Sequence, residues 1–170
     1  MLVEQNPEWG VEYERAATVL RVTLGSVVRE LYHIGSTAIP GIVAKPIIDI
    51  LGGVTNVDEL DRLTETMNAI GYEARGEFGI PGRRFFTKHN EAGERTHHLH
   101  AFDVGSNEIA IHLDFRDYMR AYPHYAQQYE SLKQALVAQY SMDRDKYTEG
   151  KSEFIREMNA KAALWRQTGE

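Results

Sequence analysis

Hydrophobic positions along this chain follow two different spacings, which predict helices and strands in turn. Near the N-terminus they recur every three or four residues, and this predicts a helix that Asn6 caps, Pro7 begins and Gly25 ends. The same period returns over 56–71, where an asparagine cap opens the segment and a glycine closes it. It returns again from Ser106 onward, so we expect the C-terminal part of the chain to be helical.

Short apolar or alternating segments lie between these helical periods and predict strands. The predicted strands cover 27–34, 47–54, 72–77, 84–88 and 96–104. Strands and helices interleave in the first half, and no linker-like stretch divides the chain. We therefore expect one α/β (α+β) domain over 1–170, with a mixed sheet of about five strands, flanking helices and a helical C-terminal part.

Composition places the chain among ordinary globular proteins. Of its 170 residues, 42% are hydrophobic and 26% are charged, and no apolar stretch approaches the ~18 residues of a membrane-spanning helix. The N-terminus lacks the pattern of a signal peptide, and the absence of cysteine excludes disulfides and thiolate metal sites, so we expect a cytoplasmic protein. A net charge of −6 disfavours broad binding to nucleic-acid phosphates, although it permits a local basic site.

The predicted strand over 27–34 runs directly into Gly35 and Ser36, and the loop that follows carries Lys45. Glycine lets backbone amides approach a phosphate closely, the serine hydroxyl adds a donor, and the lysine adds a point charge. The next strand places Asp49 among isoleucines, where an unpaired carboxylate is costly and a bound cation or a basic partner removes the cost. The alternative is that Gly35 and Ser36 form only a turn and that Asp49 pairs with an arginine.

Five blocks of the sequence, in the right order, resemble the GrpB family. They are HIGSTAIPGIVAKPIIDI at 33–50, GIPGRRFF at 79–86, RTHHLH at 95–100, FRDYMRAYP at 115–123 and YTEGKSEFIRE at 147–157. This resemblance implies a fold of the nucleotidyltransferase superfamily, whose signature is a Gly-Ser pair at a strand end followed by Asp-x-Asp on the next strand. Gly35, Ser36 and Asp49 match that signature, which makes Asp49 the candidate catalytic residue.

Leu51 departs from the signature, because it stands where the resemblance implies a second carboxylate. Alternation along a strand places Leu51 on the same face as Asp49. A two-metal site for phosphoryl transfer needs several oxygen ligands, so an ordinary two-metal site lacks one ligand here. On this interpretation, Leu51→Asp restores the missing carboxylate and improves the affinity for Mg²⁺.

Two histidines of the last predicted strand, His98 and His100, share one face of it. If the sheet order is that of the superfamily, they point to the same side as Asp49 and complete a metal site with it. Imidazole ligands shift the preference from Mg²⁺ toward Mn²⁺, Zn²⁺ or Ni²⁺. The alternative is that both histidines only donate hydrogen bonds to their neighbours.

Further candidates for phosphate binding lie in the later blocks. Arg83 and Arg84 follow a tight turn, and guanidinium groups match phosphate oxygens. Tyr147 and Lys151 are four residues apart and share a helix face, where they could stack on a base and contact a phosphate. The alternatives are that the arginines balance nearby glutamates at the surface and that the other two residues pack one helix on another.

Three functions remain open on these residues. The first is a nucleotidyltransferase that binds a nucleotide or another phosphorylated small molecule and uses a divalent metal, Mg²⁺ or Mn²⁺, with Zn²⁺ or Ni²⁺ as alternatives. The second is a binding or regulatory module without catalysis, which fits Leu51. The resemblance also implies a partner, because some GrpB-like domains are attached to dephospho-coenzyme A kinase. This attachment links the second function to cofactor metabolism. The third is a His/Asp metallohydrolase.

Overall fold

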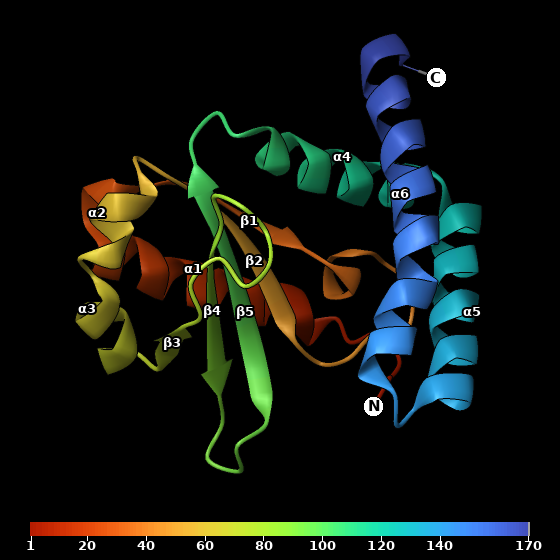
Figure 1. Ribbon diagram of the computed structural model, residues 1–170, viewed down its shortest axis with the longest axis horizontal. Coiled ribbons are helices and arrows are strands. Elements are labelled where there is room, and N and C mark those ends of the chain that lie inside the picture. The colour runs from red at the N-terminus through yellow and green to blue at the C-terminus, as the bar shows by residue number, and fades with distance from the viewer. Residues whose placement is uncertain (170) are drawn as a thin grey trace.

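The computed structural model describes residues 1–169, and its centre is a five-stranded sheet in the order β1-β2-β5-β4-β3 (Figure 1). The strands are β1 (Val28–Ile34), β2 (Ile48–Val54), β3 (Tyr72–Ala74), β4 (Arg84–His89) and β5 (Arg95–Asp103). β2 and β5 run parallel, and the other neighbouring pairs are antiparallel. The predicted mixed sheet of about five strands is therefore confirmed.

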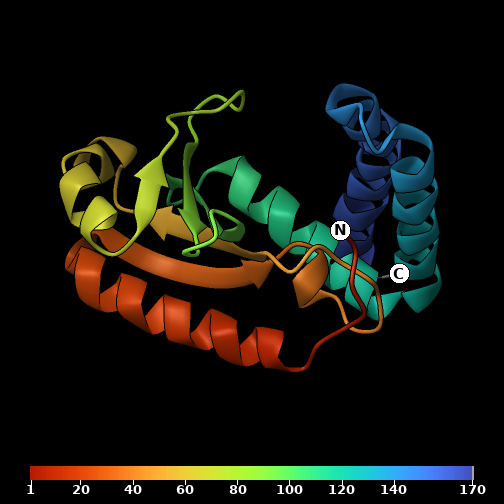
Figure 2. The same ribbon diagram turned by 90° about the horizontal axis from the view of Figure 1, so that it is seen from below.

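Helices cover both faces of this sheet and stand beyond one of its ends. They are α1 (Glu8–Leu24), α2 (Val57–Asp61), α3 (Thr64–Ala69), α4 (Asn107–Ala121), α5 (Pro123–Tyr140) and α6 (Arg144–Thr168). α1 runs along one face, beneath β1, whereas α5 and α6 stand side by side at the far end (Figure 2). None of the helices within residues 1–169 combines the length and the apolarity that crossing a bilayer requires.

Separate apolar clusters hold these layers together. The largest lies between α1 and the sheet, and its outermost members are Trp9 of α1 and Phe86 of β4. Another joins α4, α5 and α6, and it includes Ile39 and Ile42 from the loop between β1 and β2. Full burial of an aliphatic side chain stabilises a fold by about 1.5–3 kcal/mol. These two isoleucines therefore bind the loop to the C-terminal helices.

The ends of α1 follow the local signals in the sequence. Asn6 Oδ1 accepts the backbone N–H of Glu8 at 2.9 Å, and Gly25 ends the helix with a φ of 54°. The buried stripe of this helix consists of Trp9, Tyr13, Ala17, Leu20 and Leu24.

The helix predicted over 56–71 is broken into two. Asn56 caps α2 as predicted, and its Oδ1 accepts the N–H groups of Asp58 and Glu59. After Asp61 the regular ladder stops, because the hydroxyl of Thr64 donates to the carbonyl of Asp61 at 2.7 Å. Threonine competes in this way with the backbone for the helix carbonyls, and α3 begins as a new helix.

Leu51 is covered by α4, although it lies on the face of the sheet that carries Asp49. Its side chain is fully buried and packs with Ile34, Phe102 and Ile109. Ile109 belongs to α4, so this helix closes the sheet face directly beside Asp49. Leu51→Asp is therefore expected to bury an unpaired carboxylate rather than to add a metal ligand.

We expect Leu51→Asp to lower the free energy of unfolding by about 4 kcal/mol, because it loses leucine burial and places a carboxyl group among apolar side chains. Leu51→Val is the matched control and should cost about 1 kcal/mol, the burial of one methylene. Urea denaturation followed by circular dichroism measures both values. A loss below about 1 kcal/mol for Leu51→Asp would mean that solvent reaches this position.

Candidate functional site

Gly35 begins the loop over 35–46 and brings its backbone against the carboxylate of Asp49. Its φ of 74° lies in the left-handed region, which strains residues that have a Cβ. A Cβ at this position would lie 2.6 Å from Oδ2 of Asp49. Glycine is thus required here for its backbone conformation and for the close approach. Ser36 follows it and starts a short 3-10 turn, η2 (Ser36–Ala38).

Two arginines of α4 hold the outer side of this loop. Arg116 Nη1 donates to the carbonyl of His33 at 3.2 Å, and Arg120 Nε donates to the carbonyl of Ala38 at 2.9 Å. A loop has few backbone partners of its own, so side chains must satisfy its polar groups. The block that contains both arginines therefore fixes the Gly-Ser turn from the side away from the sheet.

Two side chains of α5 hold the middle of the same loop. Lys133 Nζ donates to Ser36 Oγ at 2.7 Å and to the carbonyl of Val43 at 3.0 Å. Glu130 Oε2 accepts the backbone N–H of Val43 at 3.0 Å. Because an ammonium group has no acceptor, Ser36 accepts from Lys133, and its hydroxyl also hydrogen-bonds with the side chain of Tyr129.

Lys133 is a buried cation, with only 3% of its surface exposed. Burial lowers the pKa of its ammonium group to about 8, repulsion from Lys151 adds to the shift, and Glu130 opposes it. Its Nζ lies 4.8 Å from the centre of the Tyr129 ring, where a cation is attracted by the π-electrons. The lysine thus keeps a charge in an environment that disfavours charge.

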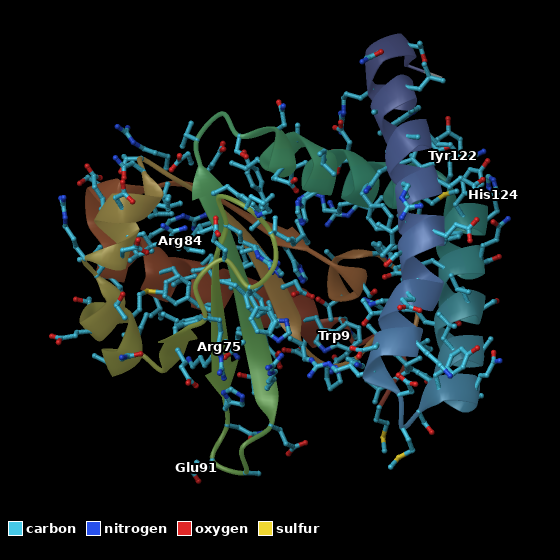
Figure 3. All side chains as sticks on the ribbon, viewed as in Figure 1. Trp9, Arg75, Arg84, Glu91, Tyr122 and His124 are labelled. Carbon is cyan, nitrogen blue, oxygen red and sulfur yellow. The ribbon has the colours of Figure 1, made fainter. Side chains whose placement is uncertain are left out.

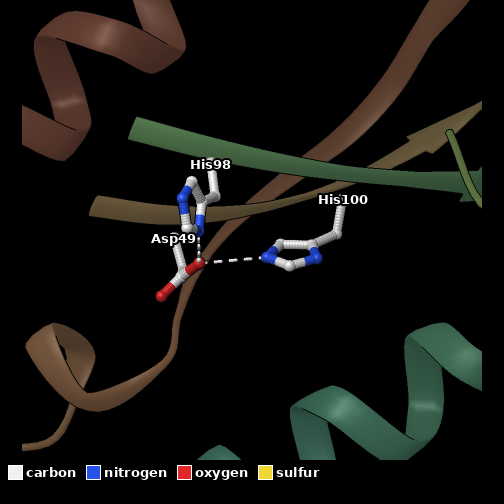
Figure 4. Close-up of side chains that lie close together, drawn as sticks. All are labelled: Asp49, His98 and His100. Carbon is white, nitrogen blue, oxygen red and sulfur yellow. Dashed lines mark hydrogen bonds and ion pairs between the residues drawn. The ribbon is translucent and has the colours of Figure 1, made fainter. Parts of the chain in front are cut away.

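Asp49 lies directly opposite His98 in the parallel pairing of β2 and β5. Its Oδ1 is 3.0 Å from Nε2 of His100 and 3.3 Å from Nδ1 of His98 (Figure 4). The three side chains come from neighbouring strands and share one face of the sheet, as the alternation of both strands predicted. The other carboxylate oxygen faces Gly35.

Hydrogen bonds set the ionisation of Asp49. Burial alone would raise its pKa, but hydrogen bonds from His100 and then from His98 outweigh this effect and hold the pKa well below its usual range. The carboxylate is therefore ionised at neutral pH. A carboxylate with such a low pKa is a weak base, and it suits orientation of a ligand better than removal of a proton.

Arg83 fixes the hydrogen-bonding state of His100. Its Nη1 lies 3.2 Å from Nδ1 of His100, while its other nitrogens donate to the carbonyls of Glu77 and Phe78. Arginine can only donate, so Nδ1 of His100 accepts and the hydrogen of the neutral ring sits on Nε2. His100 therefore donates this hydrogen to Asp49. Arg83 is 7% exposed and holds the ring of His100, and its predicted role in binding phosphate stays a prediction.

Arg84, the other arginine predicted to bind phosphate, lies away from Asp49 and the two histidines and does not line the cleft beside them. Its guanidinium group donates to both carboxylate oxygens of Asp61, at 2.8 and 3.1 Å. In the register Arg84 is paired with Ala101, which faces α1. Arg84 thus points to the α2 side of the molecule (Figure 3). The physical reason is strand alternation, together with a carboxylate on α2 that pairs with the arginine.

A cleft of about 440 Å³ lies between the Gly-Ser loop, the end of the sheet that carries Asp49, and helices α5 and α6. Its cationic side chains are Lys45, Arg95, Lys133, Arg144 and Lys151. Asp49 is the one carboxylate among the lining residues that the structure describes. Five positive charges thus surround one negative charge in a chain whose net charge is −6.

Tyr147 holds two of these cations. Lys45 Nζ lies 5.2 Å and Lys151 Nζ 5.0 Å from the centre of its ring. Burial lowers the pKa of Lys151, and repulsion from Lys45 adds to this shift. The ring therefore stabilises two like charges close together, and its faces are less open to a stacked base than the sequence suggested.

Asp49, His98 and His100 bring ligand-type atoms within 4.8 Å of one another, so they form a possible metal cluster by residue type. Their hydrogen bonds argue against a metal. The nitrogen of His100 that faces Asp49 carries a hydrogen, and the unpartnered buried nitrogen of His98, Nε2, is not the one that faces Asp49. In this arrangement the three residues do not fit a divalent metal ion.

The fold and this cleft define the chain as a protein with a nucleotidyltransferase-like fold. The Cid1 poly(U) polymerase, in a structure with Mg and 3′-dATP bound, aligns with a TM-score of 0.57 over 86% of this chain and 49% of that chain. The identity is 14%, so the likeness concerns the fold alone. The crystal structure of the conserved protein GrpB from Enterococcus faecalis aligns with a TM-score of 0.88 at 37% identity, over 95% of this chain and 96% of that one.

The chain belongs to the GrpB family, because the family model described as GrpB protein matches residues 1–161. The glutamate-rich protein GrpB of Alkalihalophilus pseudofirmus is 34% identical over 161 residues, which cover 93% of this chain and 92% of that protein. YqkA of Bacillus subtilis is 38% identical over 98% of this chain, which spans about half, 48%, of that relative. A dephospho-CoA kinase of Mycolicibacterium paratuberculosis is 25% identical over 96% of this chain and 46% of its own length.

The structure brings most of the predicted site residues to one place. Gly35, Ser36, Lys45, Asp49, His98, Tyr147 and Lys151 line the cleft, and His100 lies behind Asp49. Sequence reasoning missed Lys133, although a signal existed. It stands four residues after Tyr129 and three before Leu136, on the buried stripe of α5, where a lysine is out of place without a partner.

We expect nitrogen NMR of histidine-labelled protein to show His100 with its hydrogen on Nε2 near neutral pH, because Arg83 donates to Nδ1. Arg83→Met should release this restriction and shift both ring signals toward the averaged values of exposed His124. His124 is the internal reference, since its ring lies at the surface. A wild-type spectrum with the His100 hydrogen on Nδ1 would contradict the assignment. In that tautomer, Nε2 of His100 would have a lone pair with which to bind a metal ion beside Asp49.

Proposed function

We propose that the cleft binds a nucleotide or another phosphorylated small molecule. The observation that carries the proposal is the group of five cationic side chains around the Gly-Ser loop, with one carboxylate among them. Like charges held in a partly buried cleft repel one another, and a bound polyanion removes that repulsion. The negative net charge of the chain makes this local excess selective for a small anion over nucleic acid.

Each proposed ligand contact has a basis in the geometry. Gly35 and Ser36 line the cleft at the start of the 3-10 turn, and Lys133 holds the Ser36 hydroxyl in place. Lys45 and Lys151 reach into the cleft from opposite walls and meet at Tyr147. To these predicted contacts we add Lys133, which orients Ser36. On this proposal, the ring of Tyr147 stabilises the side chains of Lys45 and Lys151.

Transfer of a nucleotidyl group to a small acceptor is the reaction we propose if the protein is an enzyme. The shared fold with Cid1, which is named a poly(U) polymerase, favours this reaction over others. An acceptor oxygen would form a bond to the α-phosphorus while the bond to pyrophosphate breaks, and the proton of the acceptor hydroxyl would pass to solvent or to the leaving pyrophosphate. Asp49, which lines the cleft, would orient the acceptor hydroxyl, and positioning would provide most of the catalysis.

The second candidate is a module that binds a phosphorylated cofactor without chemistry. The match to a dephospho-CoA kinase, of which this chain covers 46%, favours a cofactor of that metabolism. A His/Asp metallohydrolase has the least support, because it needs free nitrogen ligands beside Asp49. His100 already donates its hydrogen to that carboxylate.

We expect Lys151→Met and Lys133→Met each to weaken the binding of ATP or dephospho-CoA by about 10-fold or more, since each removes a charge-assisted contact. Calorimetric titration in a buffer with Mg²⁺ measures the affinities. Lys161→Met is the matched control, because Lys161 also lies on α6, over the ring of Tyr125, but outside the cleft. It should change the affinity by less than about twofold.

The proposed function would be contradicted if the wild-type protein bound neither of the two ligands. An equal loss of affinity in the Lys161→Met variant would contradict it as well. A preference for ATP favours the transferase. A preference for dephospho-CoA favours the cofactor-binding module.

Binding should weaken as pH rises above about 8, the folded-state pKa of Lys133. The charged and titratable groups around this lysine are Lys45, Asp49, Tyr129, Glu130 and Lys151. Its pKa is lowered from 10.5, so it is half charged at about pH 8 and loses its remaining charge above that pH, and a bound anion favours the charged form. Titrations between pH 7 and 9.5 should show a decline in wild type that is smaller in Lys133→Met. A flat profile in wild type would contradict this role.

A further inference from the structure

We infer that the cleft binds the triphosphate of a nucleotide without a divalent metal, with lysine ammonium groups in the place that a metal ion would take. This inference rests on the proposed function, and it names the form of the ligand, which is the free polyanion and not its magnesium complex. Four features of the structure lead to it, and each is independent of the others.

The first feature is the balance of charge in the cleft. Its five cations exceed its one carboxylate by four positive charges when every lysine is protonated. A nucleoside triphosphate carries about four negative charges at neutral pH, because the second proton of its terminal phosphate leaves near pH 6. Side chains alone therefore neutralise the ligand. A divalent cation would leave the complex with an excess of two positive charges.

The second feature is the state of Asp49, the carboxylate that the fold offers for a metal. Its Oδ1 already lies within 3.0 Å of Nε2 of His100 and 3.3 Å of Nδ1 of His98. Arg83 keeps a hydrogen on the His100 nitrogen that faces the carboxylate. A metal ion at Oδ1 of Asp49 would have to displace the hydrogen bond from His100. It would also have to approach the His100 ring, whose other nitrogen contacts the guanidinium group of Arg83.

The third feature is the sheet face beside Asp49. Two metal ions need a second carboxylate close to the first, and alternation along β2 would place it at Leu51. That side chain is fully buried against Phe102 and Ile109. The helix α4 thus occupies the space in which a second ion and its water would lie.

The fourth feature is the crowding of the lysines themselves. Lys45 and Lys151 share the ring of Tyr147, at 5.2 and 5.0 Å from its centre. Lys133 is buried nearby and donates to Ser36 at 2.7 Å. Burial lowers the pKa values of Lys133 and Lys151, and repulsion among these groups adds to both shifts. An added dication would increase this repulsion, whereas a polyanion relieves it.

Calorimetric titration of ATP in EDTA and in Mg²⁺ tests the inference directly. We expect the wild-type affinities in the two buffers to differ by less than about threefold, because ammonium groups already neutralise the ligand. Inorganic tripolyphosphate should bind in EDTA as well, since the contacts are to the phosphate chain. AMP, with one phosphate, should bind at least about 10-fold more weakly than ATP.

Lys151→Met tests whether lysine takes the place of a metal. With one charge removed, the affinity for ATP in EDTA should fall by about 10-fold or more, and Mg²⁺ should recover part of the loss. Lys161→Met, on the same helix and over the ring of Tyr125, should behave as wild type in both buffers. A Lys151 variant with unchanged affinity in EDTA would overturn the inference.

The outcomes separate the inference from the proposed function. Binding of ATP only in Mg²⁺ would overturn the inference, whereas nucleotide binding by the cleft would stand. Absence of binding in both buffers would overturn both. Equal binding in both buffers, with a selective loss in the Lys151 variant, supports both.

Discussion

The loop over 35–46 lacks regular backbone pairing, and the polar groups of such a loop need partners from elsewhere in the chain. Helices α4 and α5 supply them, since Arg120 binds the carbonyl of Ala38 and Lys133 binds both Ser36 and Val43, while Arg116 binds the carbonyl of His33 near the end of β1. These contacts hold the C-terminal helices beyond the end of the sheet (Figure 2). The cleft lies between these helices and the strand that carries Asp49.

The same contacts concentrate positive charge in a chain that is acidic as a whole. Lys133 stabilises the loop through two hydrogen bonds, yet its own charge is partly desolvated, as its low pKa shows. Tyr147 offsets part of the repulsion between Lys45 and Lys151 through its ring. Cationic clefts of this kind focus the electric field and attract anions, so the repulsion among the lysines and the anion affinity proposed for the cleft have one cause.

Local signals in the sequence were sufficient for most of the elements and for the shared face of His98 and His100. Asn6 and Asn56 cap their helices because a side-chain oxygen reaches the amides two or three residues ahead, whatever the rest of the fold does. Alternation along a strand is equally local, and it placed the two histidines on one face of their strand. The prediction that Asp49 shares this face also needed the sheet order that the family resemblance implied. The family resemblance supplied the fold and the Gly-Ser turn.

Partners far apart in sequence decided the rest. Arg83 and Arg84 look alike in the sequence, but one binds His100 and the other binds Asp61, because consecutive side chains entering a strand face opposite sides with different neighbours. The role of Lys133 depends on its hydrogen bond to Ser36. The two residues are 97 positions apart in the sequence, and no local pattern encodes a contact at that separation. The sequence thus determined which chemical groups the site contains and which face they take. Only the tertiary structure determined which of them are already hydrogen-bonded and which remain charged and open to a ligand, because packing sets hydrogen-bond partners and desolvation.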